Sequence, residues 1–205
     1  KDQHVMQDYG MRSPDGVLFE LKRRCGSVVA GWQLLLDPTG AGYVSFMDFS
    51  TRLRGMGFLG SCAAAWEDLK APEAEVLTLA DLDPHGASML NNFRKVFSEK
   101  YGNMLKAWEI AFDPKGLGVV DAATFEAQCR ALQCPFEAAE LFELLRDKTL
   151  NMPTLTLREI DIRAYRAQQR GDREMITEAQ DTTPPQDLDF HERQESSLSY
   201  KWRRT

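Results

Sequence analysis

The sequence predicts an all-α protein that is built from a duplicated helical module. Apolar residues recur at helical spacing, short β-like triplets separate the helices, and one pattern returns at a constant offset of 76 residues. Eight positions carry this repeat: Gly26, Trp32, Asp37, Pro38, Gly40, Gly42, Val44 and Phe49 return as Gly102, Trp108, Asp113, Pro114, Gly116, Gly118, Val120 and Phe125.

A second, smaller repeat lies within each module, because large aromatic residues recur 34 positions apart. Each is followed by a turn-like stretch, a short triplet and a polar–apolar pair, so each unit should be helix, loop, strand, helix. We expect the four aromatic residues to be buried core anchors: Trp32, Trp66, Trp108 and Phe142. Trp32 and Trp108 should each lie near the aromatic residue that follows its own loop, Phe49 or Phe125.

The helices before the first and third loops can be traced from the apolar spacing. In Val17–Leu36 the apolar residues form one stripe, and Asp15 is the expected cap at its start. Gly26 interrupts this stripe and Gly102 interrupts its copy, so each segment should be two helices joined at a bend. The proline that follows each loop aspartate should end the second helix.

The two glycine-containing loops, Asp37–Asp48 and Asp113–Thr124, each resemble a twelve-residue EF-hand loop. Asp at position 1, Gly at position 6 and Val at position 8 carry the resemblance. Together with the aromatic anchors, the pattern is similar to the tandem EF-hand-like repeats of dinoflagellate and related alveolate proteins. This resemblance implies two EF-hand-like pairs in a calmodulin-like arrangement, with extended arms at both ends.

The loops should pair within each module through their short strands. The resemblance places Val44 opposite Leu77 and Val120 opposite Leu155, because the position-8 residue of each loop is apolar even where metal ligands are missing. Such pairing satisfies backbone groups at the end of each lobe.

The ligand sets of these loops are poor for calcium, which needs six to eight oxygens. The first loop has Ala41 at position 5, and the third has Lys115 at position 3 and Leu117 at position 5. The second loop has Glu75 where the glycine belongs, and the fourth has Pro153. We therefore expect no cofactor, with low-affinity Ca²⁺ or Mg²⁺ binding at the first loop as the alternative. The candidate ligands are Asp37, Thr39, Asp48, Asp113 and Asp121.

Composition excludes several classes of function. The net charge of −6 argues against a nucleic-acid-binding protein, and no apolar run approaches the roughly 18 residues that span a membrane. The three histidines are far apart, which argues against a zinc site. Cys129 and Cys134, on the expected helix after the third loop, are interpreted as core thiols rather than as a redox pair. No catalytic motif is present, so the protein is not expected to be an enzyme.

The chain divides into an N-terminal arm (1–16), lobe 1 (17–86), lobe 2 (87–162) and a C-terminal tail (163–205). The tail is poorer in apolar residues than the body and cannot form its own core. Its first part, to about Gln180, is expected to continue the last helix. The remainder is expected to be extended, either as a solvated linker or as an arm on a partner protein.

These features favour a non-catalytic, calcium-independent interaction or structural module, a subunit of a larger intracellular assembly. The alternative is a calcium-responsive regulatory subunit, or the regulatory domain of a larger enzyme. The partner would be a protein, either a large complex or an apolar helix. A groove for such a helix is one hypothesis, because methionine side chains adapt to apolar targets. Its candidate residues are Met47, Met56, Met89, Met104 and Met152.

Overall fold

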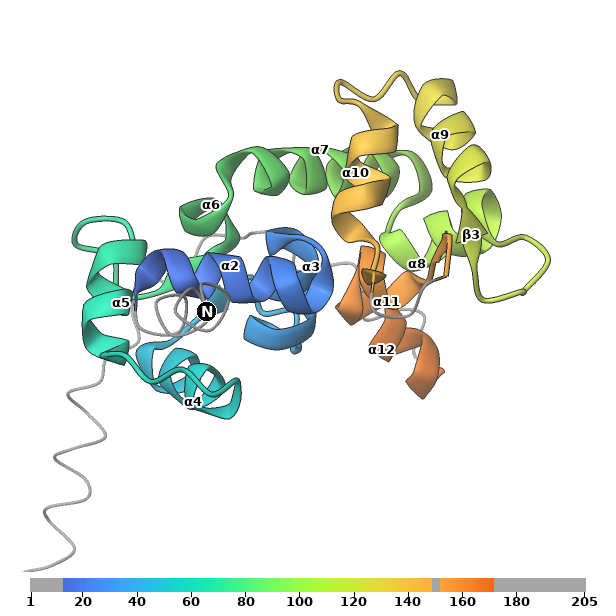
Figure 1. The fold of residues 1–205 in the computed structure, drawn as a ribbon. Helices are drawn as coiled ribbons and strands as arrows, with labels where there is room; N and C mark the ends of the chain where they lie inside the picture. The colour runs from blue at the N-terminus through green and yellow to red at the C-terminus, as the bar shows by residue number, and fades with distance from the viewer. Residues whose placement is uncertain (1–12, 149–151, 172–205) are drawn as a thin grey trace, which may run out of the picture.

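The computed structural model describes residues 13–148 and 152–171, and in these residues the protein is mainly helical. The strands form two small two-stranded sheets, so the all-α prediction is confirmed. The first part of the expected N-terminal arm, to residue 12, and the tail from residue 172 lie outside the described residues. Figure 1 shows two groups of helices side by side, with helix α7 running from one to the other.

Residues 13–83 form lobe 1, and residues 84–171 form lobe 2. Lobe 1 contains, in order, α2 (Pro14–Cys25), α3 (Val28–Gly31), the π-helical turn η1 (Trp32–Leu36), β1 (Tyr43–Val44), α4 (Phe46–Gly55), α5 (Cys62–Leu69), β2 (Leu77–Thr78) and α6 (Leu79–Leu82). Lobe 2 contains α7 (Pro84–Tyr101), α8 (Met104–Ala107), η2 (Trp108–Phe112), β3 (Val120–Asp121), α9 (Ala122–Ala131), α10 (Ala138–Leu145), β4 (Thr154–Leu155), α11 (Leu157–Ile160) and α12 (Ile162–Arg170).

The predicted boundaries need three corrections. Helix α2 begins at Pro14, inside the expected N-terminal arm (1–16). Helix α7 begins at Pro84 and runs past the expected boundary after residue 86, so lobe 2 begins at Pro84. Helix α12 begins at Ile162, where lobe 2 was expected to end, and its residues Ala164 and Ala167 are buried. It is capped by Gly171, which adopts the left-handed conformation with φ of 69°. Helix α12 thus ends at Arg170. The rest of the stretch expected to continue it, to about Gln180, lies outside the described residues.

Glycine bends the long apolar segment of each lobe, as the repeat predicts. Gly26 has φ of 91° and Gly102 has φ of 93°, a conformation that side chains of L-residues disfavour. The next helix starts at once, because Ser27 accepts a hydrogen bond from a backbone N–H one turn on, and Asn103 does the same in lobe 2. The start of α2 differs from the prediction. Its cap is Ser13, whose hydroxyl accepts from the Gly16 N–H, and Asp15 lies within the first turn.

Each bent segment ends in one π-helical turn immediately before its loop. The backbone N–H of Asp37 donates to the Trp32 carbonyl at 2.7 Å, and that of Asp113 donates to the Trp108 carbonyl at 2.8 Å. Such i→i+5 bonds widen the helix by one residue. The helices thus end before the loop aspartates in both lobes, as the prolines indicate.

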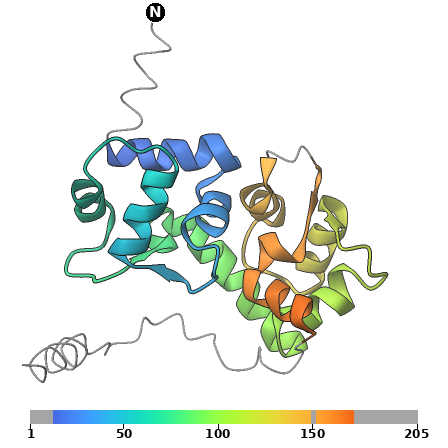
Figure 2. The same cartoon turned by 90° about the horizontal axis from the view of Figure 1, so that it is seen from below.

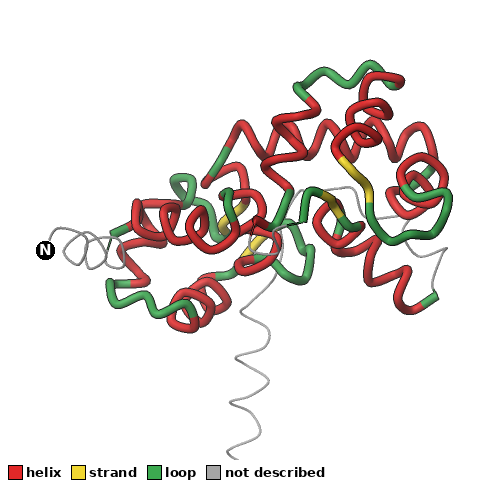
Figure 3. Tube along the Cα trace, turned by 45° about the vertical axis from the view of Figure 1, so that its right-hand side comes forward, coloured by secondary structure: helices red, strands yellow, loops and turns green. Residues whose placement is uncertain are grey.

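The short strands pair within each lobe and in antiparallel fashion. Val44 lies opposite Leu77 and Val120 lies opposite Leu155, which are the predicted pairs. Figure 3 shows the two sheets as separate yellow segments, one in each lobe. Each pairing joins two loops that are more than 30 residues apart and supplies partners for their backbone groups.

The aromatic anchors are all buried: Trp32, Trp66, Trp108 and Phe142 are each 5% exposed or less. Helix α4, which carries Phe49, packs on η1, which carries Trp32, and α9 packs on η2 in the same way. The close ring contacts of Phe49 and Phe125 are made with the other anchors. Phe49 packs on Trp66 with ring centroids 5.3 Å apart, and Phe125 packs on Phe142 at 5.6 Å. No ring contact joins Trp32 to Phe49 in the described part of the chain. The helix after each odd-numbered loop therefore contacts the anchor of the next unit, because paired units share one core.

The two lobes share a continuous hydrophobic core rather than being joined by a free linker. Figure 2 shows the two groups of helices side by side, with α7 passing from one to the other. Helix α3 of lobe 1 contacts both α7 and α10. Within this contact the Ser27 hydroxyl donates to the Leu144 carbonyl oxygen. Close approach of α3 and α7 also requires Gly86, where an added Cβ would meet the Val29 side chain.

The structure does not bring the five candidate groove methionines together on one surface. Met56, Met89 and Met104 are buried in the core, whereas Met47 is 76% exposed and Met152 is 51% exposed. Met89 and Met104 lie in α7 and α8, and Met56 directly follows α4; burial of all three against the core is favourable. The predicted methionine groove is therefore wrong.

Candidate functional site

The first loop, between η1 and β1, is closed by the carboxylate of Asp37. Its Oδ1 accepts from the Thr39 hydroxyl at 2.8 Å and from the Ala41 N–H at 3.0 Å, and its Oδ2 accepts from the Gly42 N–H at 2.7 Å. The side chain is only 4% exposed. These charge-assisted bonds stabilise the buried carboxylate and fix the turn from within the loop.

The third loop, between η2 and β3, is closed in the same way. Asp113 Oδ1 accepts from the Leu117 N–H and Oδ2 accepts from the Gly118 N–H, both at 2.6 Å. Gly116 and Gly118 have positive φ, which permits the backbone to fold over the carboxylate. Both loops thus use the position-1 aspartate to bind backbone N–H groups.

The last loop position has a different role, because it lies in the first turn of the next helix. In the first loop, Ser45 caps α4 by accepting from the Asp48 N–H, and the Ser45 hydroxyl donates to Asp48 Oδ2 at 2.8 Å. In the second loop, Asp81 Oδ2 accepts from both the N–H and the hydroxyl of Thr78, each at 2.7 Å. Ser45 is thus a side-chain N-cap, and Thr78 with Asp81 forms a capping box. Both arrangements stabilise helix starts.

In the fourth loop, the residue at the last position, Glu159, closes the loop itself. Glu159 is 6% exposed, and its Oε2 accepts from the Thr156 N–H at 2.7 Å. Its Oε1 reaches the Asp147 N–H at 3.1 Å, at the beginning of the same loop. Residues 149–151 of this loop lie outside the described residues. A carboxylate thus links the two ends of the fourth loop through hydrogen bonds.

The structure places the five candidate metal ligands in separate structural roles. Asp37, Thr39 and Asp48 lie on the first loop, but Asp48 is exposed and bonded to its own helix cap. Asp113 lies in the third loop, where Asp121 caps α9 by accepting from the Thr124 N–H at 2.8 Å. This backbone bond lowers the pKa of Asp121. Within residues 13–148 and 152–171, no group of three or more His, Cys, Asp or Glu side chains is placed to hold a metal ion.

The outer face of the first loop lies against lobe 2. A Cβ on Gly40 would collide with Ile162 at the start of α12 and would lie 2.8 Å from the Arg163 side chain. The Thr39 carbonyl also accepts from Arg166 at 3.3 Å. A cavity of about 580 Å³ lies beside this contact, between the first loop, α7 and the start of α12. The first loop is therefore an interlobe contact.

Polar side chains cross the same interface. Gln33, which is 6% exposed, donates to the Glu159 carbonyl at 2.9 Å. Arg94 of α7 donates to the Gln33 side-chain oxygen at 3.2 Å and to the Ile160 carbonyl at 2.8 Å. Gln33 is buried and Arg94 is half-buried, and both are hydrogen-bonded across the interface, so the interface fixes one relative position of the lobes. The sequence interpretation missed this network, and no short-range pattern marks it.

The helix caps were also missed, but here a sequence signal was available. A Ser, Thr or Asp residue precedes an Asp, Thr or Glu by three positions at the start of each helix that follows a loop. This spacing is typical of capping boxes and related N-caps. It assigns a local structural role to Asp48 and Asp121, which had been considered as metal ligands.

All four cysteines are free thiols. Cys25, Cys62 and Cys129 are buried, as expected of core thiols, and burial raises the pKa of Cys25 to about 11. Cys134 departs from the prediction, because α9 ends at Ala131 and Cys134 is half-buried in the turn that follows.

Comparison with known proteins adds no assignment: no family model matches the chain, and no curated protein matches it significantly. In the part of the chain that the structure describes, every helix is too short or too polar to cross a membrane.

Proposed function

We propose that the chain is a non-catalytic, calcium-independent EF-hand-like module that serves as an interaction or structural subunit of a larger protein assembly. The arrangement of helix, loop, strand and helix, with strands paired inside each lobe, supports the EF-hand-like assignment. Within the proposal, the loops are packing elements that join helices, and the lobes act as one rigid body.

The closure of the loops by their own carboxylates carries this proposal. Asp37 and Asp113 are buried, and each accepts hydrogen bonds from two backbone N–H groups of its loop. A hydrogen bond to a charged group contributes about 1.5–3 kcal/mol. Such bonds hold each loop in shape without a cation, and the third loop presents Lys115 where a cation would need an oxygen ligand.

The perturbed acidic groups support a non-catalytic role. The pKa of Glu20 is lowered to about 2 by hydrogen bonds from Arg23 and Arg24, and that of Glu143 is lowered chiefly by Arg146. The pKa of Asp121 is lowered by the hydrogen bond that it accepts from the Thr124 N–H at the start of α9. In each case an ion pair or a helix start accounts for the shift, whereas a catalytic site would place such groups around a shared cavity.

Exposed apolar side chains support a protein partner. Among the described residues, the large apolar side chains that are at least 41% exposed occur in both lobes: Phe19, Phe46, Met47, Leu59, Ile110, Leu117 and Met152. Phe46 and Met47 are adjacent at the start of α4. Covering such groups in an assembly removes apolar surface from water and favours association.

Calorimetric titration of the full chain with CaCl₂ tests the calcium-independent role. We expect no binding heat at micromolar calcium and no change in tryptophan fluorescence. Asp37→Asn is the test variant, and Asp113→Asn is the matched control in the third loop. A sub-micromolar site that disappears only in Asp37→Asn would favour the calcium-responsive alternative instead.

Gel filtration of native-source extract tests the subunit role separately. The chain should elute in a particle much larger than itself, equally in calcium and in chelator. Elution as a free monomer under both conditions would contradict the proposed assembly. Dissociation only on chelation would contradict calcium independence while leaving the assembly intact.

A further inference from the structure

The turn after α9 brings two cysteines together. Gln133 adopts a left-handed conformation with φ of 52°, and its N–H donates to the Arg130 carbonyl at 3.1 Å. The next N–H, that of Cys134, donates to the Cys129 carbonyl at 3.0 Å. This pair of bonds is the Schellman motif, in which the side chains at the positions of Cys129 and Cys134 lie on the same side of the turn and commonly pack together.

The equivalent turn of lobe 1 shows what this geometry normally joins. Gly57 has φ of 85°, and the Phe58 N–H donates to the Leu53 carbonyl at 2.9 Å. Leu53 and Phe58 are 1% and 4% exposed, so this turn closes with a buried apolar pair. Lobe 2 keeps the backbone turn but carries a thiol at both contact positions.

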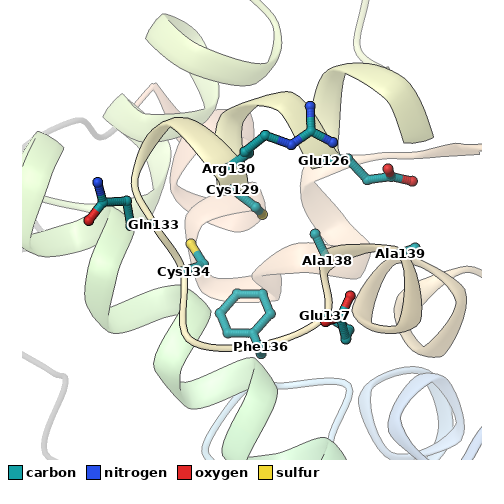
Figure 4. Close-up of a pocket in the computed structure, with 9 residues that line it drawn as sticks. All are labelled: Glu126, Cys129, Arg130, Gln133, Cys134, Phe136, Glu137, Ala138 and Ala139. Atoms are coloured by element: carbon teal, nitrogen blue, oxygen red, sulfur yellow. The ribbon is translucent and has the colours of Figure 1, made fainter.

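The two cysteines also line one cavity, and of the two only Cys134 is partly exposed. Cys129 and Cys134 line a cavity of about 400 Å³ between α9, the connection and the start of α10. In Figure 4 the two side chains extend into this space from the helix and from the connection. Cys134 is half-buried and Cys129 is buried behind it, so a small molecule in the cavity meets the Cys134 sulfur first.

The backbone hydrogen bond limits the distance between the Cα atoms of Cys129 and Cys134. With N···O at 3.0 Å, standard covalent dimensions keep the two Cα atoms within about 7 Å of each other. Disulfides span Cα separations of about 4.4–6.8 Å. A small adjustment of the turn therefore suffices, whereas Cys25 and Cys62 lie in lobe 1 on α2 and α5.

We propose that Cys129 and Cys134 are a reversible oxidation site that forms an internal disulfide with a small-molecule disulfide as oxidant. The Cys134 thiol loses its proton and attacks one sulfur of the oxidant, which releases one small thiol and leaves a mixed disulfide. The Cys129 thiol then loses its proton and attacks the Cys134 sulfur, which releases the second small thiol. The two cysteines are oxidised together by two electrons, and the oxidant is reduced to two thiols.

The bond would tie the end of α9 to the connection that leads into α10. Helix α10 contacts α3 of lobe 1 and α7, so the oxidised turn would restrain an element of the interlobe contact. Burial raises the pKa of both thiols. The pair therefore exchanges slowly at neutral pH.

The sequence offers a direct assay, because trypsin cleaves after Arg130, between the two cysteines. The folded full chain is incubated with hydroxyethyl disulfide, and remaining thiols are then alkylated. A non-reducing digest should give peptides 116–130 and 131–146 as one linked species, two hydrogens lighter than their sum. Reduction should separate them.

Cys134→Ser should abolish the linked species, and Cys62→Ser, a matched change in lobe 1, should leave it unchanged. Circular dichroism checks that both variants are folded. Persistent mixed disulfide on Cys134, absence of reaction, linkage to Cys25 or Cys62, or linkage that forms only in denaturant would each overturn the proposal.

Discussion

The first and third loops have nearly the same internal structure but lie in different surroundings. Both are closed by an aspartate that accepts two backbone N–H bonds. An added Cβ at Gly40 would collide with α12, whereas one at Gly116 would meet no atom of the described residues within 4 Å. The repeat thus specifies the loop, and its position in the fold specifies what the loop contacts.

The two loops have different surroundings because they occupy different places in the fold. The first loop faces the last helix of lobe 2, and the third loop lies at the outer end of the described structure, where Leu117 is 69% exposed. The bends show the same asymmetry. Gly26 lies close to the Lys148 side chain, while an added Cβ at Gly102 would have no neighbour within 4 Å among the residues that the structure describes. Duplication therefore produced two similar lobes with different surfaces.

The largest expected effect tests the equivalence of the two cores. Trp32→Ala and Trp108→Ala should each reduce the free energy of unfolding by about 3–5 kcal/mol, because each removes a large buried ring. Urea denaturation followed by circular dichroism measures both. A loss below about 1 kcal/mol at either position, or ready acrylamide quenching of either tryptophan, would contradict the repeat-based core.

The next prediction separates loop strain from interlobe contact. Gly40→Ala and Gly116→Ala share the cost of a left-handed residue, about 1–2 kcal/mol. Gly40→Ala should cost about 1–3 kcal/mol more, because the new methyl group overpacks the contact with α12. Thermal denaturation of the two variants gives the difference. Equal losses would show that the first loop is not held against lobe 2 in solution.

A third prediction uses a charge that only lobe 1 has. Glu20 accepts from Arg23 at 2.6 Å and from Arg24 at 2.7 Å, while the equivalent residue of lobe 2 is Val96. These bonds lower the pKa of Glu20 from 4.5 to about 2. Its stabilising effect is therefore complete above the unfolded value and is lost as pH falls from 4.5 toward 2.

Urea midpoints of wild type and Glu20→Gln at about pH 6 and about pH 3 test this window. The wild type should be more stable by about 1 kcal/mol at the higher pH, and the difference should shrink at the lower pH. Glu143→Gln is the control. The Glu143 side chain is 50% exposed, so its ion pair with Arg146 should contribute less to the free energy of unfolding than the ion pairs of Glu20. A difference that grows with acid would contradict the prediction.

The smallest effect concerns the turns after α4 and α9. Lobe 1 has Gly57 at the left-handed position, and lobe 2 has Gln133 there. Gln133→Gly should raise the free energy of unfolding by up to about 1 kcal/mol, since glycine removes the steric cost of positive φ. A stability curve in guanidinium chloride measures this. Destabilisation would indicate that the Gln133 side chain makes contacts that outweigh the backbone strain.

The sequence by itself determined the features that depend on local chemistry. The repeat predicted the bends at Gly26 and Gly102, and the pairing of Val44 with Leu77 and of Val120 with Leu155. Positive φ is a property of glycine, and strand register follows from the equivalent position in each loop. The burial of the aromatic anchors followed from helical spacing in the same way.

Only the tertiary structure decided which surfaces meet. Gln33 contacts Glu159, a residue 126 positions later, and Gly40 lies against Ile162. Such contacts depend on the relative position of whole helices, which small changes in packing angle alter and which no short pattern encodes. The same reason explains why Met56, Met89 and Met104 entered the core while Met47 stayed exposed. A residue's type limits the contacts it can make, but the packing of the lobes selects among them.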